Sequence, residues 1–374
     1  MFYMSPFVRC LFAHQREKWN AWMDRVPHDF YHRAEYHLMA EQEGEGTACL
    51  AVCCDQRRFL AWPYLLVPLA SVNGLESTDL CDITSVYGYP GPVGLNGDAG
   101  HSFLSEAMSA IQELWRAQRA VSVFTRTNPL LDHISTPESF GTRLQIGQTI
   151  SLDLRMPLEV SWAQFRRGHR YEIQKGHQAG VLFWHDEQWR FLKDFILLYT
   201  QTMRRKRADS RYFFKERYFA RLREASGSAA CHLLVALYRQ DVAAAAIFTE
   251  CCGIVQYHLS VMREEYRRLA PVKVLLDGAR VWAKARGNTV LHLGGGHAGA
   301  EDSLFQFKAG FSKRRHPFFV WRTVLDQPKY DVLAATRAQY SARHGLVSQC
   351  PDFFPRYRQP LITGERFPTP NALD

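Results

Sequence analysis

Apolar positions in the first half of the chain recur at intervals that predict a short series of strands and one long helix. The runs 48–54 and 58–68 flank a polar turn and predict two strands. Apolar residues then fall on one stripe at helical spacing between 102 and 118, which predicts an amphipathic helix. The run 121–125 predicts a further strand directly after that helix.

The second half repeats this order. The runs 230–237, 242–249 and 255–262 predict three strands, and a polar loop follows them. Pro271 suits the first position of the next helix, because its missing N–H needs no partner there. The run 289–293 predicts the closing strand. The repeated order of strand, strand, loop, helix and strand predicts a duplicated α+β domain.

Two helical segments lie between the repeats. One is a basic region at 162–180, and the other spans 189–207 and ends in a run of cations. We therefore expect a first domain at 1–155, a second at 156–330, and a tail at 331–374 that packs on the surface.

Composition narrows the class of protein. The 374 residues exceed one ordinary core and fit two domains, and an apolar fraction of 47% supplies both. The net charge of +9 favours an anionic partner such as a nucleic acid or a phosphorylated substrate. The nine cysteines form no Cys-x-x-Cys pair, so we expect reduced thiols and no metal site.

No apolar run approaches the roughly 20 residues that cross a bilayer. The segment Met1–Phe12 contains Arg9 and lacks the long apolar stretch of a signal peptide. We expect a cytoplasmic protein without a transmembrane segment, and peripheral contact with a membrane stays open.

The stretch 289–326 combines features that suggest chemistry. Three glycines, Gly294 to Gly296, follow the closing strand and allow close approach of a ligand or backbone. The segment 303–311 then places one lysine, Lys308, among three phenylalanines. Each feature alone fits an ordinary turn and an ordinary core helix, but their order favours a site.

This order resembles the end of the Fem-type transferases, which belong to the GNAT superfamily. The resemblance rests on Gly294-Gly295-Gly296, Ser303-Leu304-Phe305 and Phe307-Lys308-Ala309-Gly310-Phe311. It implies an α+β fold of two tandem GNAT-like domains, each a mixed central sheet flanked by helices. Fem proteins move an aminoacyl group from aminoacyl-tRNA to an amine of a peptidoglycan precursor. BioF2-like acetyltransferase relatives share the same pattern.

The resemblance implies roles for Phe307 and Lys308, since the matching pair is implicated in the Fem site. Amide formation needs relief of the amine's proton and stabilisation of charge on the tetrahedral intermediate. Lys308 is our candidate for the second task, and the alternative is a lysine that extends from a core helix to solvent. His292 and His297 are candidate bases, although a structural histidine is an equally good interpretation of either. Asp302 is a catalytic acid or a helix N-cap.

The substrate-binding candidates come from two loops. The family places much of the acceptor site in the first domain, where a proline-rich turn carries two tyrosines; a rigid structural turn is the alternative. The second loop is the glycine turn with its neighbouring rings. The predicted residues are Tyr87, Gly88, Tyr89, Gly91, Gly294, Gly295, Phe305 and Phe311.

The loop 263–270 bears on the identity of the donor. GNAT acetyltransferases hold the coenzyme A pyrophosphate on backbone N–H groups of a glycine-rich turn, but this loop has no glycine. Its arginines can instead contact phosphates of a nucleic acid. The candidates for donor phosphate or tRNA contact are Arg204, Arg205, Arg263, Arg267 and Arg268.

The sequence thus predicts a Fem-like transferase that forms an amide on an amine acceptor, in cell-envelope or peptidyl-metabolite biosynthesis. Aminoacyl-tRNA is the favoured donor, and no tightly bound cofactor is expected. One alternative is an N-acetyltransferase that uses acyl-CoA. Another, from a different class, is a non-catalytic RNA- or peptide-binding module on the same fold.

Overall fold

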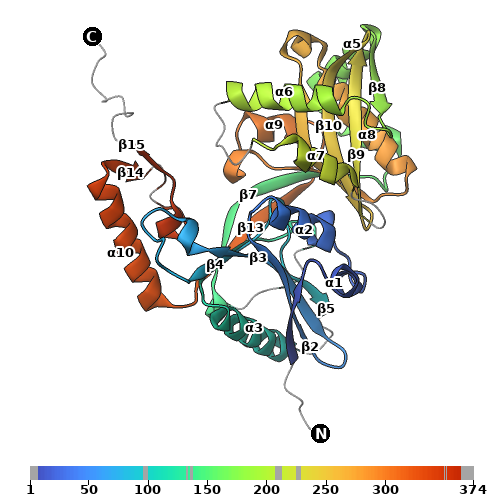
Figure 1. Cartoon of the computed structure of the whole chain (residues 1–374). Helices are drawn as coiled ribbons and strands as arrows, with labels where there is room; N and C mark the ends of the chain where they lie inside the picture. Colours follow the sequence, from blue (N-terminus) through green and yellow to red (C-terminus); the bar gives the residue numbers. More distant parts are fainter. Residues whose placement is uncertain are drawn as a thin grey trace.

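The computed structural model describes residues 7–95, 100–131, 134, 138–206, 213–224, 229–348, 350 and 352–363. The predicted end of the helix at Arg207 and the end of the tail at 364–374 lie outside these residues. Figure 1 shows two lobes that are joined by two long strands, with a helix against the outer side of the first lobe.

The first half of the chain folds as a mixed sheet with helices on both faces. Neighbouring strands β1 to β4 are antiparallel, β6 is parallel to β4, and the short β5 pairs with β3. Helix α3 connects the parallel pair, as a crossover must. The elements are β1 (Phe7–Phe12), α1 (Arg16–Met23), α2 (Ala34–Gln42), β2 (Thr47–Cys54), β3 (Phe59–Pro68), β4 (Cys81–Thr84), β5 (Val93–Leu95), α3 (Gly100–Ala117) and β6 (Ala120–Arg126).

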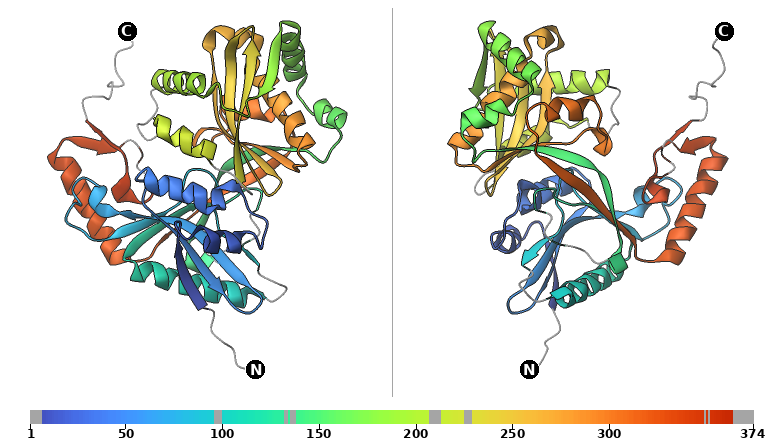
Figure 2. Two further views of the ribbon diagram at one scale, coloured as in Figure 1. Left: turned by 45° about the vertical axis from the view of Figure 1, so that its right-hand side comes forward. Right: turned by 180° about the vertical axis from the view of Figure 1, so that it is seen from behind.

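Strand β2 explains why helices cover both faces, since it is apolar at every position from Ala48 to Cys53. Successive side chains of a strand point to opposite faces. Leu50 and Val52 pack with α1 and α2, whereas Ala51 and Cys53 pack with α3. Because β2 is apolar on both faces, each face of the sheet needs a covering layer. Figure 2 shows the two helical layers.

The second half repeats the arrangement. Strands β8 to β11 are antiparallel neighbours, and β12 is parallel to β11 after the crossover helix α8. The elements are α4 (Leu158–Ala163), α5 (Arg167–Gln178), β8 (Val181–His185), α6 (Leu192–Arg205), α7 (Glu216–Glu224), β9 (Ala229–Tyr238), β10 (Asp241–Cys251), β11 (Ile254–Met262), α8 (Pro271–Ala285), β12 (Val290–Gly294) and α9 (Ser303–Ala309). The α+β class and the mixed sheets flanked by helices are confirmed.

Two strands connect the halves, because each of them pairs with a strand of the half to which it does not belong in the sequence. Strand β7 (Thr142–Asp153) follows β6 in the chain but pairs with β12 of the second half. Strand β13 (Arg315–Val324) follows the second half but pairs with β6 of the first. The two strands also pair with each other, and they lie side by side between the lobes in Figure 2. Within the part of the chain that the structure describes, the result is one continuous sheet of 13 strands. The domain bounds 1–155 and 156–330 stay a prediction, and each exchanged strand pairs with a strand of the opposite half.

The halves also share a hydrophobic core. Trp19 and Leu50 of the first half belong to the same buried cluster as Phe195 and Ile247 of the second. Burial of this shared apolar surface stabilises the arrangement of the halves, because separating them would expose it to water.

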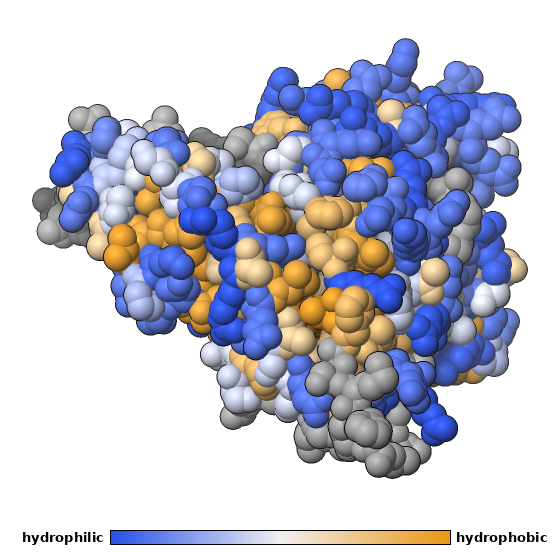
Figure 3. All heavy atoms as spheres, turned by 60° about the horizontal axis from the view of Figure 1, so that its bottom comes forward, coloured by the Kyte–Doolittle hydropathy of each residue, from blue (hydrophilic) through white to orange (hydrophobic). Residues whose placement is uncertain are grey.

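The tail contains more structure than the sequence suggested. Helix α10 (Gln327–Arg343) precedes a two-stranded sheet of β14 (Leu346–Ser348) and β15 (Leu361–Thr363). Tyr330 and Leu333 of α10 pack with Val121 of β6, on the first half. Figure 3 shows apolar surface gathered across the middle of the face that it draws. No helix among the described residues is long and apolar enough to cross a membrane.

Candidate active site

The candidate site lies where strands β11 and β12 stop pairing. They are hydrogen-bonded in parallel at only three positions, and the last is Gln256 opposite His292. Beyond this point β11 continues beside β10, while β12 stays paired with β7 as far as Gly294 opposite Ile150. Side chains from both halves of the chain converge at this point.

The glycine turn begins with a residue that needs to be glycine. Gly294 has φ +74°, a left-handed conformation that side chains rarely adopt. A Cβ atom built there would lie 3.2 Å from the Tyr89 hydroxyl and 3.4 Å from Lys308 Nζ. The Cα of Gly294 thus lies beside both groups, and a larger residue would intrude between them. The next residue approaches β7 closely, since a Cβ on Gly295 would lie 2.6 Å from the Gln148 carbonyl oxygen.

Lys308 reaches this turn from helix α9. The N-cap of α9 is Asp302, whose carboxylate accepts a hydrogen bond from the Phe305 N–H at 2.9 Å. Of the two roles predicted for Asp302, the structure thus places it as a helix cap. Lys308 Nζ donates to the Gly295 carbonyl oxygen at 2.6 Å, and the residue is only 8% exposed. Burial lowers the pKa of Lys308 to about 8. The prediction of a lysine with restricted hydration agrees with this burial, and a lysine extending to solvent does not.

The three phenylalanines around Lys308 have different surroundings. Phe305 and Phe311 are buried in the core of the second half, together with Leu293. Phe307 is half-buried, and its ring lies against His169 of α5 at 5.7 Å between centroids. The Phe305 and Phe311 rings hold α9 in place, so their role in substrate binding stays a prediction, as does that of Phe307 in catalysis.

His292 lies next to the same turn, fully buried. Its ring meets that of Tyr89 edge-on at 5.2 Å, and its Nδ1 lies 2.6 Å from the Gln256 side-chain oxygen. Burial lowers the pKa of His292 well below its usual value, and His316 and Lys308 add to the effect. His292 is therefore a neutral imidazole at neutral pH. The other candidate base, His297, is exposed beyond the turn.

A contact that the sequence did not indicate links His292 with Asp29, which lies at the start of the short helix η1 (Phe30–His32). Gln256 Nε2 donates to Asp29 Oδ2 at 2.6 Å, and so connects the first half to the site. A glutamine within the otherwise apolar start of strand β11 was the one visible signal. Asn128 also donates to Asp29 Oδ2, at 3.1 Å.

The loop of the first half that contains Tyr87 and Tyr89 approaches the site, and its two tyrosines have different surroundings. Tyr89 contacts His292 and lies beside Lys308, as described above. Tyr87 is 41% exposed, and its ring meets His258 at 5.5 Å. Gly88 and Gly91 are required by packing, since added Cβ atoms would lie 2.4 Å from the Tyr31 ring and 2.8 Å from Thr127 Cα. The structure thus brings Tyr89, Gly294, Gly295, Lys308 and His292 together.

The predicted phosphate-binding arginines form a separate group at the end of α6 and in the helix η5 (Glu264–Leu269). Arg205 and Arg267 both pair with Glu264, at 2.9 and 3.0 Å. Arg263 donates to the Val242 carbonyl oxygen at 3.2 Å. Arg204 and Arg268 are exposed. The glutamate therefore neutralises part of this cluster, and its contact with phosphate stays a prediction.

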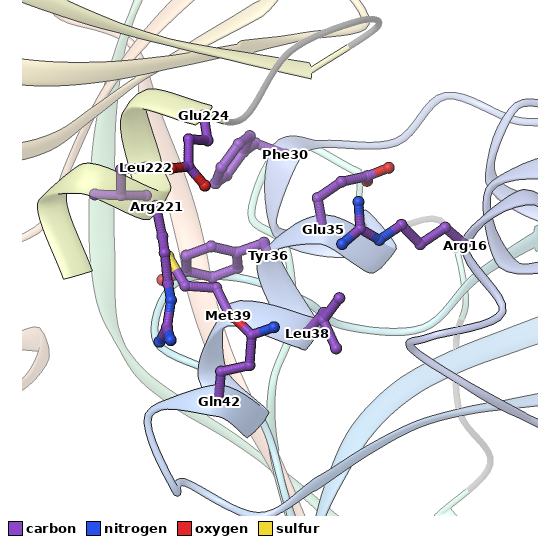
Figure 4. Close-up of a pocket in the computed structure, with 10 residues that line it drawn as sticks. All are labelled: Arg16, Phe30, Glu35, Tyr36, Leu38, Met39, Gln42, Arg221, Leu222 and Glu224. Atoms are coloured by element: carbon purple, nitrogen blue, oxygen red, sulfur yellow. The ribbon is translucent and has the colours of Figure 1, made fainter. Parts of the chain in front are cut away.

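A pocket of about 100 Å³ lies elsewhere, between α2 and α7. Figure 4 shows Tyr36 and Met39 on one side of it and Arg221 and Leu222 on the other. Two of its charged side chains have partners outside it, since Arg221 pairs with Glu43 and Glu35 lies 3.7 Å from Arg33. It includes none of the residues at the glycine turn. Among the described residues, no three His, Cys, Asp or Glu side chains are placed to hold a metal ion.

Comparison with known proteins shows what the chain is similar to. Residues 163–308 match the family model of the acetyltransferase (GNAT) domain, a range that ends at Lys308. This segment is a GNAT domain. It contains β11, β12 and the glycine turn, so the GNAT domain supplies every residue of the converging group except Tyr89.

Solved structures extend the likeness of fold to most of the chain. FemX has 12% sequence identity and a TM-score of 0.64, with 87% of this chain and 99% of FemX covered. The C-terminal domain of a protein named as a lysylphosphatidylglycerol synthetase from Agrobacterium fabrum has 14% identity and a TM-score of 0.52, with 88% and 96% covered. No curated protein matches the chain. The Fem-like GNAT fold of the chain and its GNAT domain together support an acyltransferase.

Gly294→Ala tests whether glycine is needed here for the space beside Tyr89 and Lys308 or only for the backbone conformation of the turn. We expect the rate of transfer to fall about 10-fold, because the methyl group would displace the Tyr89 hydroxyl or Lys308 Nζ. Gly287→Ala is the matched control, since Gly287 has φ +83° and no atom within 4 Å of an added Cβ. Both variants should lose about 1 kcal/mol of unfolding free energy. Equal transfer rates in the two variants would assign Gly294 to backbone conformation alone.

Proposed function

We propose that this chain is a Fem-like transferase that moves an aminoacyl group from aminoacyl-tRNA to an amine acceptor and forms an amide. The observation that supports this most is the buried Lys308 ammonium beside the Tyr89 hydroxyl and the Gly294–Gly295 turn. A cation and a hydroxyl donor at one point can stabilise the oxyanion that forms when an amine attacks a carbonyl. Lys308 and Tyr89 would supply these donors, and His292 would take the proton of the amine.

The start of helix α8 supports aminoacyl-tRNA over acyl-CoA. In GNAT acetyltransferases the coenzyme A pyrophosphate is held by free backbone N–H groups at a helix N-terminus. Here Pro271 has no N–H, and the N–H groups of Lys273 and Val274 both bond to the Ala270 carbonyl oxygen. Helix α5 also packs against this end, because Lys273 pairs with Glu172 and Gly176 faces the Leu269 carbonyl. The exposed cations near η5 would then contact tRNA phosphates through their side chains.

The second candidate is an N-acyltransferase that uses acyl-CoA, because GNAT domains typically take that donor. Radiolabelled aminoacyl-tRNA and acetyl-CoA, each offered with the same panel of amines, separate the two. We expect label to move from aminoacyl-tRNA. Label moving only from the thioester would overturn the tRNA proposal and leave acyl transfer intact. A non-catalytic binding module predicts no movement from either donor, together with tight binding of RNA.

The pKa of Lys308 predicts a specific dependence of the rate on pH. The pKa of about 8 lies below the usual value for lysine, so the ammonium is present below pH 8 and is lost as pH rises through it. We expect kcat to fall by up to about 10-fold for each pH unit above 8. In Lys308→Arg the cation persists, because arginine does not deprotonate in this range. The decrease in kcat above pH 8 should therefore be absent up to pH 10 in that variant. An unchanged decrease would mean that another group causes it.

A further inference from the structure

A buried line of polar side chains connects the first half of the chain to His292. It consists of Asp29 before η1, Gln256 on β11 and His292 on β12. All three are nearly inaccessible, with exposed fractions of 0%, 2% and 0%. Asp29 and Gln256 are 227 residues apart in the chain, so the fold alone brings them together. Burial of three polar groups is costly unless they are hydrogen-bonded, which makes the directions of their bonds informative.

The bond directions follow from Asp29. Its carboxylate accepts from the Phe30 N–H at 2.6 Å, from Asn128 Nδ2 at 3.1 Å and from Gln256 Nε2 at 2.6 Å. An ionised carboxylate can only accept, so the NH₂ group of Gln256 must face it. The carbonyl oxygen of Gln256 then faces His292 Nδ1, at 2.6 Å. Since that oxygen can only accept, His292 must donate from Nδ1.

A proton on Nδ1 leaves the lone pair of a neutral imidazole on Nε2. His292 Nε2 is buried and has no hydrogen-bond partner among the residues that the structure describes. The groups that face this imidazole are Tyr89 from the loop, Lys308 from α9 and His316 from β13. The two nearby basic groups keep the resting ring neutral, so the lone pair on Nε2 is available to accept a proton during the reaction.

We infer that Asp29 and Gln256 are positioning residues that hold His292 in its Nδ1-protonated tautomer, so that Nε2 can accept the proton of the attacking amine. The inference rests on the proposed amide-forming function. In the step, the amine nitrogen bonds to the donor carbonyl carbon, and the ester C–O bond of the aminoacyl donor breaks. The amine's proton passes to Nε2, and His292 returns it to the leaving oxygen. The first half of the chain thereby sets the protonation of the second-half site.

Substitution of Asp29 by Asn tests the direction of the hydrogen bonds. An Asn side chain cannot accept on both of its terminal atoms, because one of them is an NH₂ group. When that NH₂ group faces Gln256, the glutamine amide must turn over and present its own NH₂ group to His292. His292 Nδ1 then has to accept, and the proton moves to Nε2. Burial raises the pKa of Asp29 to about 6, so the carboxylate is ionised in the wild type at pH 7.5.

The tautomer is measured by ¹H–¹⁵N NMR of protein labelled with ¹⁵N-histidine at pH 7.5, with His292→Gln to identify the signal. We expect Nδ1–H in the wild type and a shift toward Nε2–H in Asp29→Asn. We expect the same shift in Gln256→Met, which removes the acceptor for Nδ1. Asp326→Asn is the matched control, because this N-cap of α10 does not contact the site. The His232 signal, from a residue bonded to Glu250, reports an intact fold.

Activity provides an independent readout. The kcat of Asp29→Asn should fall about 10- to 100-fold with KM nearly unchanged, since a positioning role acts on the chemical step. An Nε2–H signal in the wild type would overturn the inference, and so would an unchanged tautomer in both variants. The NMR outcome does not depend on turnover. If no donor is used but the tautomer shifts as expected, the line of hydrogen bonds stands and the amide-forming role falls with the proposed function.

Discussion

Replacement of Lys308 by Met should lower kcat about 10²- to 10³-fold, the effect of removing one donor from an oxyanion site. Methionine keeps the length and the apolar stem of the side chain, so the packing of α9 should be preserved. The substitution removes the Nζ donor that lies 2.6 Å from the Gly295 oxygen. Steady-state rates of amide formation, with saturating donor and acceptor, measure the loss.

The control for this prediction is Lys313→Met, which removes an exposed lysine close to the end of the same helix. Its rate should match the wild type, because the side chain is exposed to solvent. Undiminished transfer by Lys308→Met would show that the lysine does not stabilise charge. We also expect Lys308→Met to leave the fold at least as stable, since an apolar group suits a buried position better than a desolvated ammonium.

The second large effect is expected at Trp321, the anchor of the exchanged strand β13. Its indole is 1% exposed and packs 5.0 Å from the ring of Trp62, with Trp115 at 6.5 Å. Truncation of a buried aromatic side chain typically costs about 3–5 kcal/mol. Trp321→Ala should therefore lower the free energy of unfolding by that amount, measured by urea denaturation with far-ultraviolet circular dichroism.

Trp184→Ala serves as the comparison, because Trp184 lies on the edge strand β8 and is 56% exposed. Its effect should stay within about 0.5 kcal/mol, as for most surface substitutions. A cost below about 1 kcal/mol for Trp321→Ala would contradict the role of the strand exchange in joining the halves.

The sequence was sufficient where an element keeps one strong pattern. Strands β2, β3, β10 and β11 are long apolar runs, and their predicted positions agree with the structure within about two residues. Helix α8 was also predicted, from Pro271 and its apolar stripe. These elements are buried on wide faces, so their pattern is local and clear.

Other elements lacked such a pattern. Strand β7 was missed because its first seven residues, Thr142–Gln148, are largely exposed and polar. Helix α10 was missed because only Tyr330, Leu333 and Arg337 are buried along its 17 residues. The exchange of β7 and β13 could not be predicted at all, since pairing partners are set by tertiary packing rather than by the residues of one strand.

The residues of the candidate site also differ in how well the sequence predicted them. Lys308 and the glycines lie within one stretch of the chain, and their order in the sequence was enough to suggest a site. Asp29 and Gln256 are joined to His292 only by the contact of the two halves, and no spacing in the chain indicates it. For the arginines near η5 the sequence shows the cluster but not the ion pairs within it. Glu264 pairs with two of these arginines and offsets their charge.

The most direct test of the proposed transfer reaction is to look for the product bond. Wild-type protein is incubated with a ¹³C-labelled aminoacyl-tRNA and a panel of amines, and the acceptors are examined by mass spectrometry. We expect one acceptor to gain the mass of the labelled aminoacyl group through an amide, and we expect Lys308→Met to lose this product. Amide formed equally by wild type and Lys308→Met, or no amide from aminoacyl-tRNA alongside tight binding of RNA, would refute the proposed function.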